Sequence, residues 1–290
     1  MKLLVIGASG FVGSHLYNSA VARGFKVIGT RCGKEDPRLI KFDLLSDSMT
    51  DIVNTNFGDT TNLCAVICAA NPKIEWCYSQ KELSYRLNVS STIRTIEELT
   101  NMGIKCVFLS SDYVYDGKQG YYDESILPSP STEYGRQKAE VERYIINNHP
   151  QNLILRLSMT VGDDPAENHL LARWYESITA GETINCIEGQ VFSPTFVEDV
   201  SEGILGALDQ DLCGLYNLCN NEFFNRAELA KQFMIAVKGT SNIVSMPVSS
   251  FNFSEERPLL TYLDGSKLRN AVGIQFTSMR DVFKKFIRNI

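Results

Sequence analysis

A tyrosine and a lysine stand four residues apart in the segment YGRQK, residues 134–138. Apolar residues at Val141 and Ile145 continue one helical face, so Tyr134 and Lys138 share its buried side, one turn apart. A nearby cation favours the phenolate and lowers the pKa of a tyrosine toward neutral pH. Such a tyrosine can give a proton to a carbonyl oxygen while hydride reaches the carbon, or remove one in reverse. Because this spacing also arises by chance, the pair needs further support.

That support comes from the segment LSSDYVY, residues 109–115, which ends an apolar run predicted to be a strand, residues 105–110. A hydroxyl at the carboxyl end of a parallel strand lies where ligands bind in open α/β sheets. Ser111 is placed to hydrogen-bond a carbonyl oxygen and orient it for Tyr134, with Ser110 as the alternative. We therefore predict Ser111, Tyr134 and Lys138 as the catalytic residues.

A glycine-rich turn, GASGFVG at residues 7–13, follows the first predicted strand, residues 2–6. The first glycine permits the tight turn, the second lets the backbone approach a pyrophosphate, and the third lets helix and strand pack closely. The helix that follows directs free N–H groups and a partial positive charge at the phosphates. A glycine triplet alone is a weak signal, but in this strand–turn–helix setting it predicts a dinucleotide site.

The second predicted strand, residues 26–30, indicates which dinucleotide to expect. NAD enzymes usually place Asp or Glu at its end, on the ribose hydroxyls. Here Arg31 follows the strand directly, and a guanidinium can pair with the additional 2′-phosphate of NADP. The sequence favours NADP bound by Arg31. NAD stays open, because Glu35 or Asp36 could turn back to the ribose.

Short apolar runs alternate with longer amphipathic segments, as in βαβ units. Further strands are predicted at residues 64–68 and 153–156, and a helix at residues 82–101. After residue 161 the predicted strands are shorter (183–187, 215–218, 243–246) and alternate with helices (168–180, 197–208, 225–237). We predict an α/β chain: a Rossmann-type doubly wound parallel sheet that binds NADP, residues 1–160, and a smaller C-terminal α/β substrate lobe, residues 161–290. Residues of about 190–210 are expected to return to the first domain.

Composition narrows the function classes. A net charge of −6 and a pI near 5.3 argue against nucleic acid as a partner. No apolar run approaches the ~20 residues that span a bilayer, and the N-terminal run is too short for a signal peptide. We therefore expect a cytoplasmic protein without a membrane partner. The 8 cysteines and 3 histidines are dispersed and form no CxxC pair, so no metal site is expected.

The order and spacing of these motifs resemble the extended short-chain dehydrogenases/reductases. More narrowly, the chain resembles the dTDP-4-dehydrorhamnose reductase family. The similar segments cover nearly the whole chain: LSSDYVYDG (109–117), YGRQKAEVE (134–142), LRLSMTVG (155–162), FSPTFVEDV (192–200) and RPLLTYLDGSKL (257–268).

This resemblance implies an oxidoreductase that uses NADPH or NADH to reduce the 4-keto group of a nucleotide-diphosphate 6-deoxysugar, in deoxysugar or polysaccharide biosynthesis. It implies that Lys138 also holds the nicotinamide ribose beside Tyr134. Further cofactor contacts are implied for Gly7, Ser9, Gly10, Phe11, Val12, Gly13, Asp43, Leu44, Ala69, Ala70 and Asn71. Substrate contacts are implied for Ser111, Tyr113, Tyr134, Met159 and Arg257.

Two departures from the family leave the sugar open. Met159 stands where the rhamnose enzymes typically carry a tryptophan, and Cys68 stands where they usually carry an asparagine. An epimerase or dehydratase of the same superfamily is one alternative, although Asp112 and Tyr113 after the catalytic serine differ from the dehydratase pattern. A second is a non-catalytic NADP-binding regulatory subunit, because the regulatory partner of methionine adenosyltransferase is similar at residues 68–70 and 110–117. A homodimer is left open.

Overall fold

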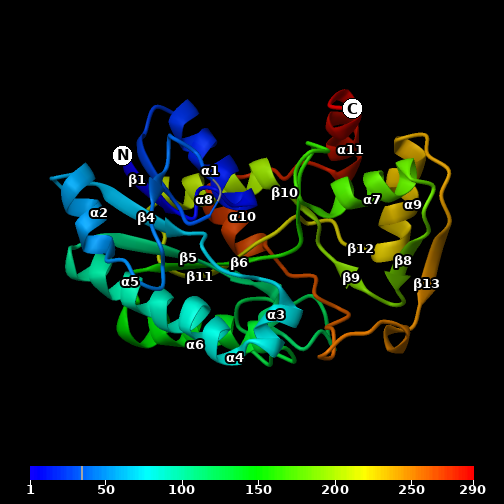
Figure 1. Cartoon of the computed structure of the whole chain (residues 1–290), viewed down its shortest axis with the longest axis horizontal. Coiled ribbons are helices and arrows are strands. Elements are labelled where there is room, and N and C mark those ends of the chain that lie inside the picture. Colours follow the sequence, from blue (N-terminus) through cyan, green and yellow to red (C-terminus); the bar gives the residue numbers. More distant parts are fainter. Residues whose placement is uncertain (34) are drawn as a thin grey trace.

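Seven parallel strands form the central sheet of this computed structural model, which describes residues 1–33 and 35–290 (Figure 1). Their order is β11-β6-β5-β4-β1-β2-β3, and each neighbouring pair is parallel. The strands are β1 (Lys2–Ile6), β2 (Lys26–Arg31), β3 (Ile40–Lys41), β4 (Leu63–Ile67), β5 (Lys105–Ser111), β6 (Leu153–Leu157) and β11 (Gly214–Leu218). The reversal of strand order at β1 is that of a doubly wound sheet, so the predicted Rossmann-type α/β fold is confirmed.

Helices cover both faces of the sheet (Figure 1). One face carries α2 (Met49–Asn56), α5 (Ser91–Asn101) and α6 (Glu133–Asn148), and the other carries α1 (Phe11–Ala22), α8 (Val197–Asp209) and α10 (Ser266–Val272). Alternate residues of β1 enter the two cores: Leu4 and Ile6 on the first face, Leu3 and Val5 on the second. A strand buried on both sides is apolar throughout, which explains its uninterrupted apolar sequence.

The C-terminal lobe has a core of its own (Figure 1). Its centre contains Trp174, Phe233 and Phe286, all buried. Around them lie α7 (Leu170–Thr179), α9 (Arg226–Ala236), α11 (Met279–Arg288) and the strand pairs β8 (Ile184–Ile187) with β13 (Ile243–Met246), β9 (Val191–Phe192) with β12 (Phe224–Asn225), and β7 (Thr160–Val161) with β10 (Thr195–Phe196). A short 3-10 helix, η3 (Val248–Ser250), follows β13.

Three segments that follow residue 161 lie on the first domain. Helix α8 packs against α1, β11 pairs with β6 at the sheet edge, and α10 packs against α8 and β11. The returning part of the chain therefore reaches beyond residue 210, while the division into two domains near residue 160 stays a proposal. None of the helices in the described residues is long and apolar enough to cross a membrane.

The helix predicted at residues 82–101 is interrupted. It consists of α4 (Lys81–Tyr85), a π-helical turn η1 (Arg86–Ser90) and α5, and it follows the short helix α3 (Ile74–Ser79). A π turn inserts one residue and rotates the side chains around it, often at functional sites. Here it contains Asn88, whose side chain is buried.

Candidate active site

The glycine turn joins β1 to α1 at the carboxyl edge of the sheet. Gly7 has φ +90°, and a Cβ there would lie 2.8 Å from the Ala69 backbone nitrogen. A Cβ at Gly13 would lie 2.2 Å from the Gly7 carbonyl oxygen, so side chains are excluded at both positions. Gly10 is the N-cap of α1 and supplies no capping side chain. The first N–H groups of α1 are therefore left for an anion to cap.

A pocket of about 270 Å³ opens beside this turn. It is lined by eight of the predicted cofactor residues: Gly7, Ser9, Gly10, Arg31, Asp43, Leu44, Ala69 and Ala70. Phe11, Val12, Gly13 and Asn71 do not line it, and neither do Tyr134 and Lys138. The structure thus gathers only part of the residues predicted for the pyrophosphate and adenosine into one cavity.

Arg31 enters the pocket from the end of β2 without an engaged acid. Its Nε is buried and has no hydrogen-bond partner among the described residues. The nearby Asp36 is paired with Arg38 at 2.7 Å, and this pairing holds the pKa of Asp36 low, at about 2. Asp36 is therefore already paired, whereas Glu35, the other acid considered as an alternative ribose ligand, is exposed. The Arg31 Nε is available to an anion.

Phe11 points from the turn toward the C-terminal lobe. Its ring lies 5.4 Å from the His169 ring, stacked, and 5.5 Å from the His15 ring, edge-on. His15 Nδ1 bonds Glu198 at 2.7 Å and its Nε2 bonds Glu167 at 3.0 Å. Burial disfavours the His15 charge, but the hydrogen bonds to the two carboxylates outweigh it and raise its pKa to about 9. We call His15, Glu167 and Glu198 the His15 latch, and it joins α1 to α8 and to the loop before α7.

Ser111 and Tyr134 meet at the end of β5. Ser111 is the last residue of the strand, before the 3-10 turn η2 (Asp112–Val114), and its hydroxyl lies next to the Tyr134 phenol and lowers the pKa of that phenol against the larger effect of burial. Tyr134 stands in the first turn of α6, where Thr132 caps the helix by accepting from the Gly135 N–H at 3.1 Å. Ser110, the alternative, instead donates to the buried Glu142 at 2.5 Å. The geometry thus pairs Ser111 with Tyr134.

Lys138 lies below Tyr134 on the same helix. Its Nζ donates to the Leu109 carbonyl oxygen at 2.8 Å and lies 5.8 Å from the centre of the Tyr134 ring. Burial lowers the pKa of Lys138 to about 8. The pKa of Tyr134 is raised, by burial first and by the charge of Asp112 second, so the lowering expected from the spacing was wrong for the protein alone. The ammonium is engaged by a backbone carbonyl, so it does not offset the burial of the phenol.

Asp112 is a functional candidate that the sequence reasoning passed over. Its carboxyl is buried, and the Ser111 hydroxyl donates a hydrogen bond to it at 3.0 Å. Burial raises the pKa of Asp112 to about 7. The sequence signal was its position directly after Ser111, which brings its carboxyl within hydrogen-bond distance of the serine hydroxyl.

Asn71 is held by the π-helical turn. Asn88 Oδ1 accepts from the Asn71 N–H at 3.0 Å, and Asn88 Nδ2 donates to the Asn71 carbonyl at 3.1 Å. The same Nδ2 donates to Gln137 on α6 at 2.9 Å. The loop after β4, predicted to line the cofactor, is therefore tied to the helix that carries Tyr134.

Tyr113 and Arg257 lie near one another. The Tyr113 ring is 6.3 Å from the Tyr134 ring, edge-on. Burial and then the charge of Asp112 raise the pKa of the Tyr113 phenol, and the charge of Arg257 opposes this. Arg257 Nη2 donates to Glu75 at 2.5 Å, while its buried Nη1 has no partner among the described residues. Met159 packs with Phe11 against the core of the C-terminal lobe. The predicted substrate residues thus lie where the two lobes meet.

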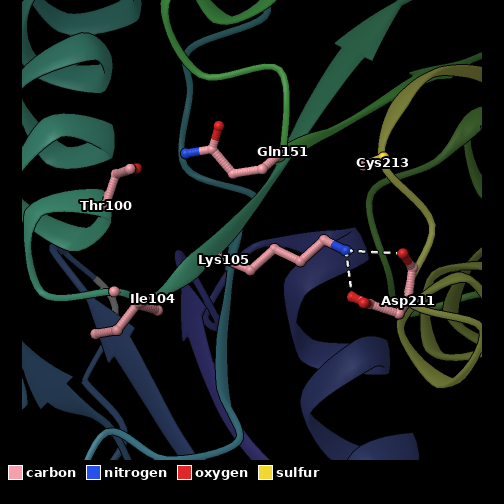
Figure 2. A pocket seen from close by; sticks show the side chains of 7 residues that line it. Thr100, Ile104, Lys105, Gln151, Asp211 and Cys213 are labelled. Atoms are coloured by element: carbon pink, nitrogen blue, oxygen red, sulfur yellow. Dashed lines mark hydrogen bonds and ion pairs between the residues drawn. The ribbon is translucent and has the colours of Figure 1, made fainter.

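A different pocket lies at the opposite edge of the sheet. It measures about 350 Å³ and is lined by Thr100, Gly103, Ile104, Lys105, Gln151, Asp211 and Cys213 (Figure 2). Lys105 Nζ is held there by the Asp211 carboxylate at 2.5 Å and its carbonyl at 3.0 Å. Because it lies at the amino ends of the strands and contains no predicted site residue, it is not the candidate site. The described residues contain no group of three His, Cys, Asp or Glu side chains arranged to hold a metal.

The chain is similar over nearly its whole length to proteins of one family. The family model described as the RmlD substrate binding domain matches residues 1–290. The chain is 26% identical over 284 residues to methionine adenosyltransferase 2 subunit beta of Xenopus tropicalis, covering 94% of this chain and 83% of that protein. It is 24% identical over 290 residues to a probable low-salt glycan biosynthesis reductase of Haloferax volcanii, covering 97% and 95%. The crystal structure of dTDP-4-dehydrorhamnose reductase from Bacillus anthracis in complex with NADP superposes with a TM-score of 0.87 at 23% identity, covering 100% of both chains.

Proposed function

The chain belongs to the family of the RmlD substrate binding domain, and from that premise we propose that it is an NADPH-dependent reductase of the 4-keto group of a nucleotide-diphosphate 6-deoxysugar. The observation that carries the proposal is that Ser111 and Tyr134 lie side by side, with Lys138 one turn further along α6, at the carboxyl edge of a sheet that also forms the glycine-turn pocket. We further propose that it acts in the cytoplasm.

Proton transfer in this site belongs to Tyr134. Its raised pKa keeps the phenol protonated at neutral pH, so it can donate to the developing alkoxide oxygen of a reduced ketone. Ser111 is placed to donate a second hydrogen bond to that oxygen. Once the proton has left, the buried Lys138 ammonium stabilises the phenolate across the 5.8 Å between its Nζ and the ring. Bound NADPH would supply the hydride.

The residues that would hold NADPH fit its charges. The glycine turn offers the uncapped N-terminus of α1 to the pyrophosphate, and Arg31 offers an unengaged Nε beside the same pocket. NADP carries one more phosphate than NAD, and a guanidinium without an acid partner is suited to it. We therefore propose NADPH as the preferred cofactor, with NADH as the weaker one.

The test is a panel of 4-keto-6-deoxysugars linked to dTDP, GDP, UDP or CDP, incubated with the protein and NADPH. We expect the absorbance of NADPH at 340 nm to fall with at least one member. Tyr134→Phe should lower that rate by a factor of about 10² to 10⁴ while NADPH binding is retained. Tight NADPH binding without oxidation by any member would contradict the reductase proposal.

A regulatory role is the second candidate, because the beta subunits of methionine adenosyltransferase 2 are among the chain's relatives. In that case the protein binds NADPH and changes the activity of a partner enzyme, and Tyr134→Phe leaves that effect unchanged. Stoichiometric NAD in the purified protein would instead indicate an epimerase or dehydratase. These outcomes separate the three proposals without knowledge of the sugar.

A further inference from the structure

The chain returns from the C-terminal lobe to the first domain along residues 254–257, which we call the strap (Figure 1). The strap follows η3 and is bonded to α3 at both of its ends. There the Glu75 carboxylate accepts from the Ser254 N–H at 3.2 Å and from Arg257 Nη2 at 2.5 Å. Because α3 packs against α6, the strap is fixed beside the helix that carries Tyr134.

Glu255, in the middle of the strap, caps the first turn of α6. Both of its carboxylate oxygens accept from the Glu133 N–H at 2.9 Å, and one of them also accepts from Arg136 Nη2 at 2.7 Å. The Glu255 side chain is only 6% exposed, so these bonds are largely shielded from water. The first N–H groups of a helix lack partners within the helix, and a negative charge beside them is favourable for the helix dipole. An acid from a segment distant in sequence thus satisfies the first N–H of α6.

Tyr134 stands between two backbone N–H groups that are both capped. Glu255 accepts from the N–H before it, at Glu133. Thr132 accepts from the N–H after it, at Gly135, at 3.1 Å. A shift of this first turn moves the phenol with it, and a displacement of about 1 Å at a reacting group can lower turnover by about 10²-fold. An acid that fixes the turn is therefore placed to affect catalysis without contacting the substrate.

We propose that Glu255 is a positioning residue of the active site, which fixes the first turn of α6, and with it the Tyr134 phenol, from the strap. The inference rests on the proposed function, because Tyr134 is the proton donor in that proposal. Arg257, predicted to contact the substrate, lies two residues beyond Glu255 on the same strap. A movement of the C-terminal lobe that draws the strap away from α6 would release the capped N–H and displace the phenol. The strap therefore links the position of the lobe to the geometry of the proton donor.

The experiment compares Glu255→Ala and Glu255→Gln with a neighbouring control. Glutamine keeps an oxygen that can accept from the Glu133 N–H but removes the charge that pairs with Arg136, whereas alanine removes both. Glu256→Ala is the matched control, because Glu256 is exposed on the same strap and its bond with Ser131 uses its backbone carbonyl. For each variant we measure kcat and KM with the most active sugar nucleotide of the panel, the Kd of NADPH, and the melting temperature as a measure of folding.

We expect Glu255→Ala to lower kcat by about 10-fold or more, because the phenol is no longer held in place. The Kd of NADPH should change by less than about 3-fold, since no strap residue lines the glycine-turn pocket. Glu255→Gln should recover part of kcat, because it restores the hydrogen bond to the helix. Glu256→Ala should change kcat by less than about 2-fold, as expected for an exposed charge.

A double substitution separates positioning from a general loss of structure. In Tyr134→Phe, measured as single turnovers with excess enzyme, Glu255→Ala should lower the rate little further, because the group that it positions is already absent. Equal fold losses in the wild-type and Tyr134→Phe backgrounds would overturn the inference, and so would equal kcat values of Glu255→Ala and Glu256→Ala. Failure of the wild type to oxidise NADPH with any sugar nucleotide would instead overturn the proposed function, and the positioning role of Glu255 with it.

Discussion

Two buried charges, one turn apart on helix α6, are paired differently. The Glu142 carboxylate is paired with Arg156 at 2.6 Å, and both side chains are 1% exposed. Tyr115 accepts a hydrogen bond from Arg156, and Ser110 donates one to Glu142, both at 2.5 Å. The Lys138 ammonium has a backbone carbonyl but no acid within ion-pair distance among the described residues.

Asp112 resembles Lys138 in this respect. Its buried carboxyl accepts a hydrogen bond from the Ser111 hydroxyl at 3.0 Å, and no cation lies within ion-pair distance of it among the described residues. A fully paired network specifies and rigidifies a core, whereas an incompletely paired charge keeps a desolvation cost that a ligand can relieve. We propose from this difference that the Glu142–Arg156 network serves stability, and that Lys138 and Asp112 serve binding and proton transfer. The predictions below test this division, beginning with the largest effect.

Glu142→Gln should destabilise the protein by about 3–5 kcal/mol, because it leaves the Arg156 charge buried without its partner. Urea unfolding followed by circular dichroism measures the loss. Glu140→Gln is the control on the same helix, since Glu140 bonds Tyr85 at an exposed position. The control should change the free energy of unfolding by less than about 0.5 kcal/mol. Equal effects of the two substitutions would show that the buried Glu142–Arg156 pair contributes no more to stability than an exposed carboxylate.

Lys138→Met should stabilise the protein at pH 7, in contrast to Glu142→Gln, although it abolishes the proposed activity. The pKa of Lys138 is lowered from 10.5 to about 8, so below pH 8 the folded state carries a buried charge that costs about 3 kcal/mol. The substitution removes this cost and one hydrogen bond to Leu109, for a net gain of about 2 kcal/mol.

The pH dependence of that gain follows from the same linkage. The cost is fully present below pH 8 and disappears as pH rises to 10.5, where the unfolded chain also loses its proton. The difference in unfolding free energy between Lys138→Met and the wild type should therefore shrink toward zero over this window. A variant less stable than the wild type at pH 7 would show that Lys138 is a stabilising residue.

Local sequence signals were sufficient for much of the fold and the site. The apolar runs of β1, β4 and β5 predict strands because burial on both faces demands apolar side chains at every position. The glycine turn and the Ser111–Tyr134 pair were predictable because their steric and chemical requirements lie within short motifs. Arg31 was predictable from its position at a strand end.

Features that depend on contacts distant in sequence could not be predicted in this way. Residues 215–218 were predicted as a strand, but nothing local indicates that β11 joins the main sheet beside β6. The π-helical turn that contains Asn88 has residue types that also occur in a regular α-helix, so the spacing of apolar residues does not reveal it. Arg226 resembles a surface residue in sequence, because the side chains that surround its guanidinium, Gln190 and Trp174, come from other segments.

Asp112→Asn should remove a fall of about 10-fold in kcat/KM of the proposed reduction that the wild type shows as pH rises through 7. The pKa of Asp112 is raised to about 7, so its carboxyl becomes charged as pH rises through 7. That charge raises the pKa of Tyr134 and makes the phenol a weaker proton donor. We expect kcat/KM of the wild type to fall through pH 7 and that of Asp112→Asn to stay flat. If kcat/KM of Asp112→Asn also fell through pH 7, a group other than Asp112 would be responsible for the pH dependence.

The His15 latch is a partly exposed group of charges and should give the smallest effect, about 1 kcal/mol. Both ring nitrogens face carboxylates, with side chains 29% and 45% exposed, so solvent screens a large part of the interaction. The pKa of His15 is raised from 6.5 to about 9, so its contribution is fully present below pH 6.5 and lost as pH rises through 9. The stability gap between the wild type and His15→Gln, measured by urea unfolding, should therefore be about 1 kcal/mol at pH 6 and close to zero at pH 10. A gap that stays constant over this range would mean that His15 contributes by packing against Phe11 and not through its charge.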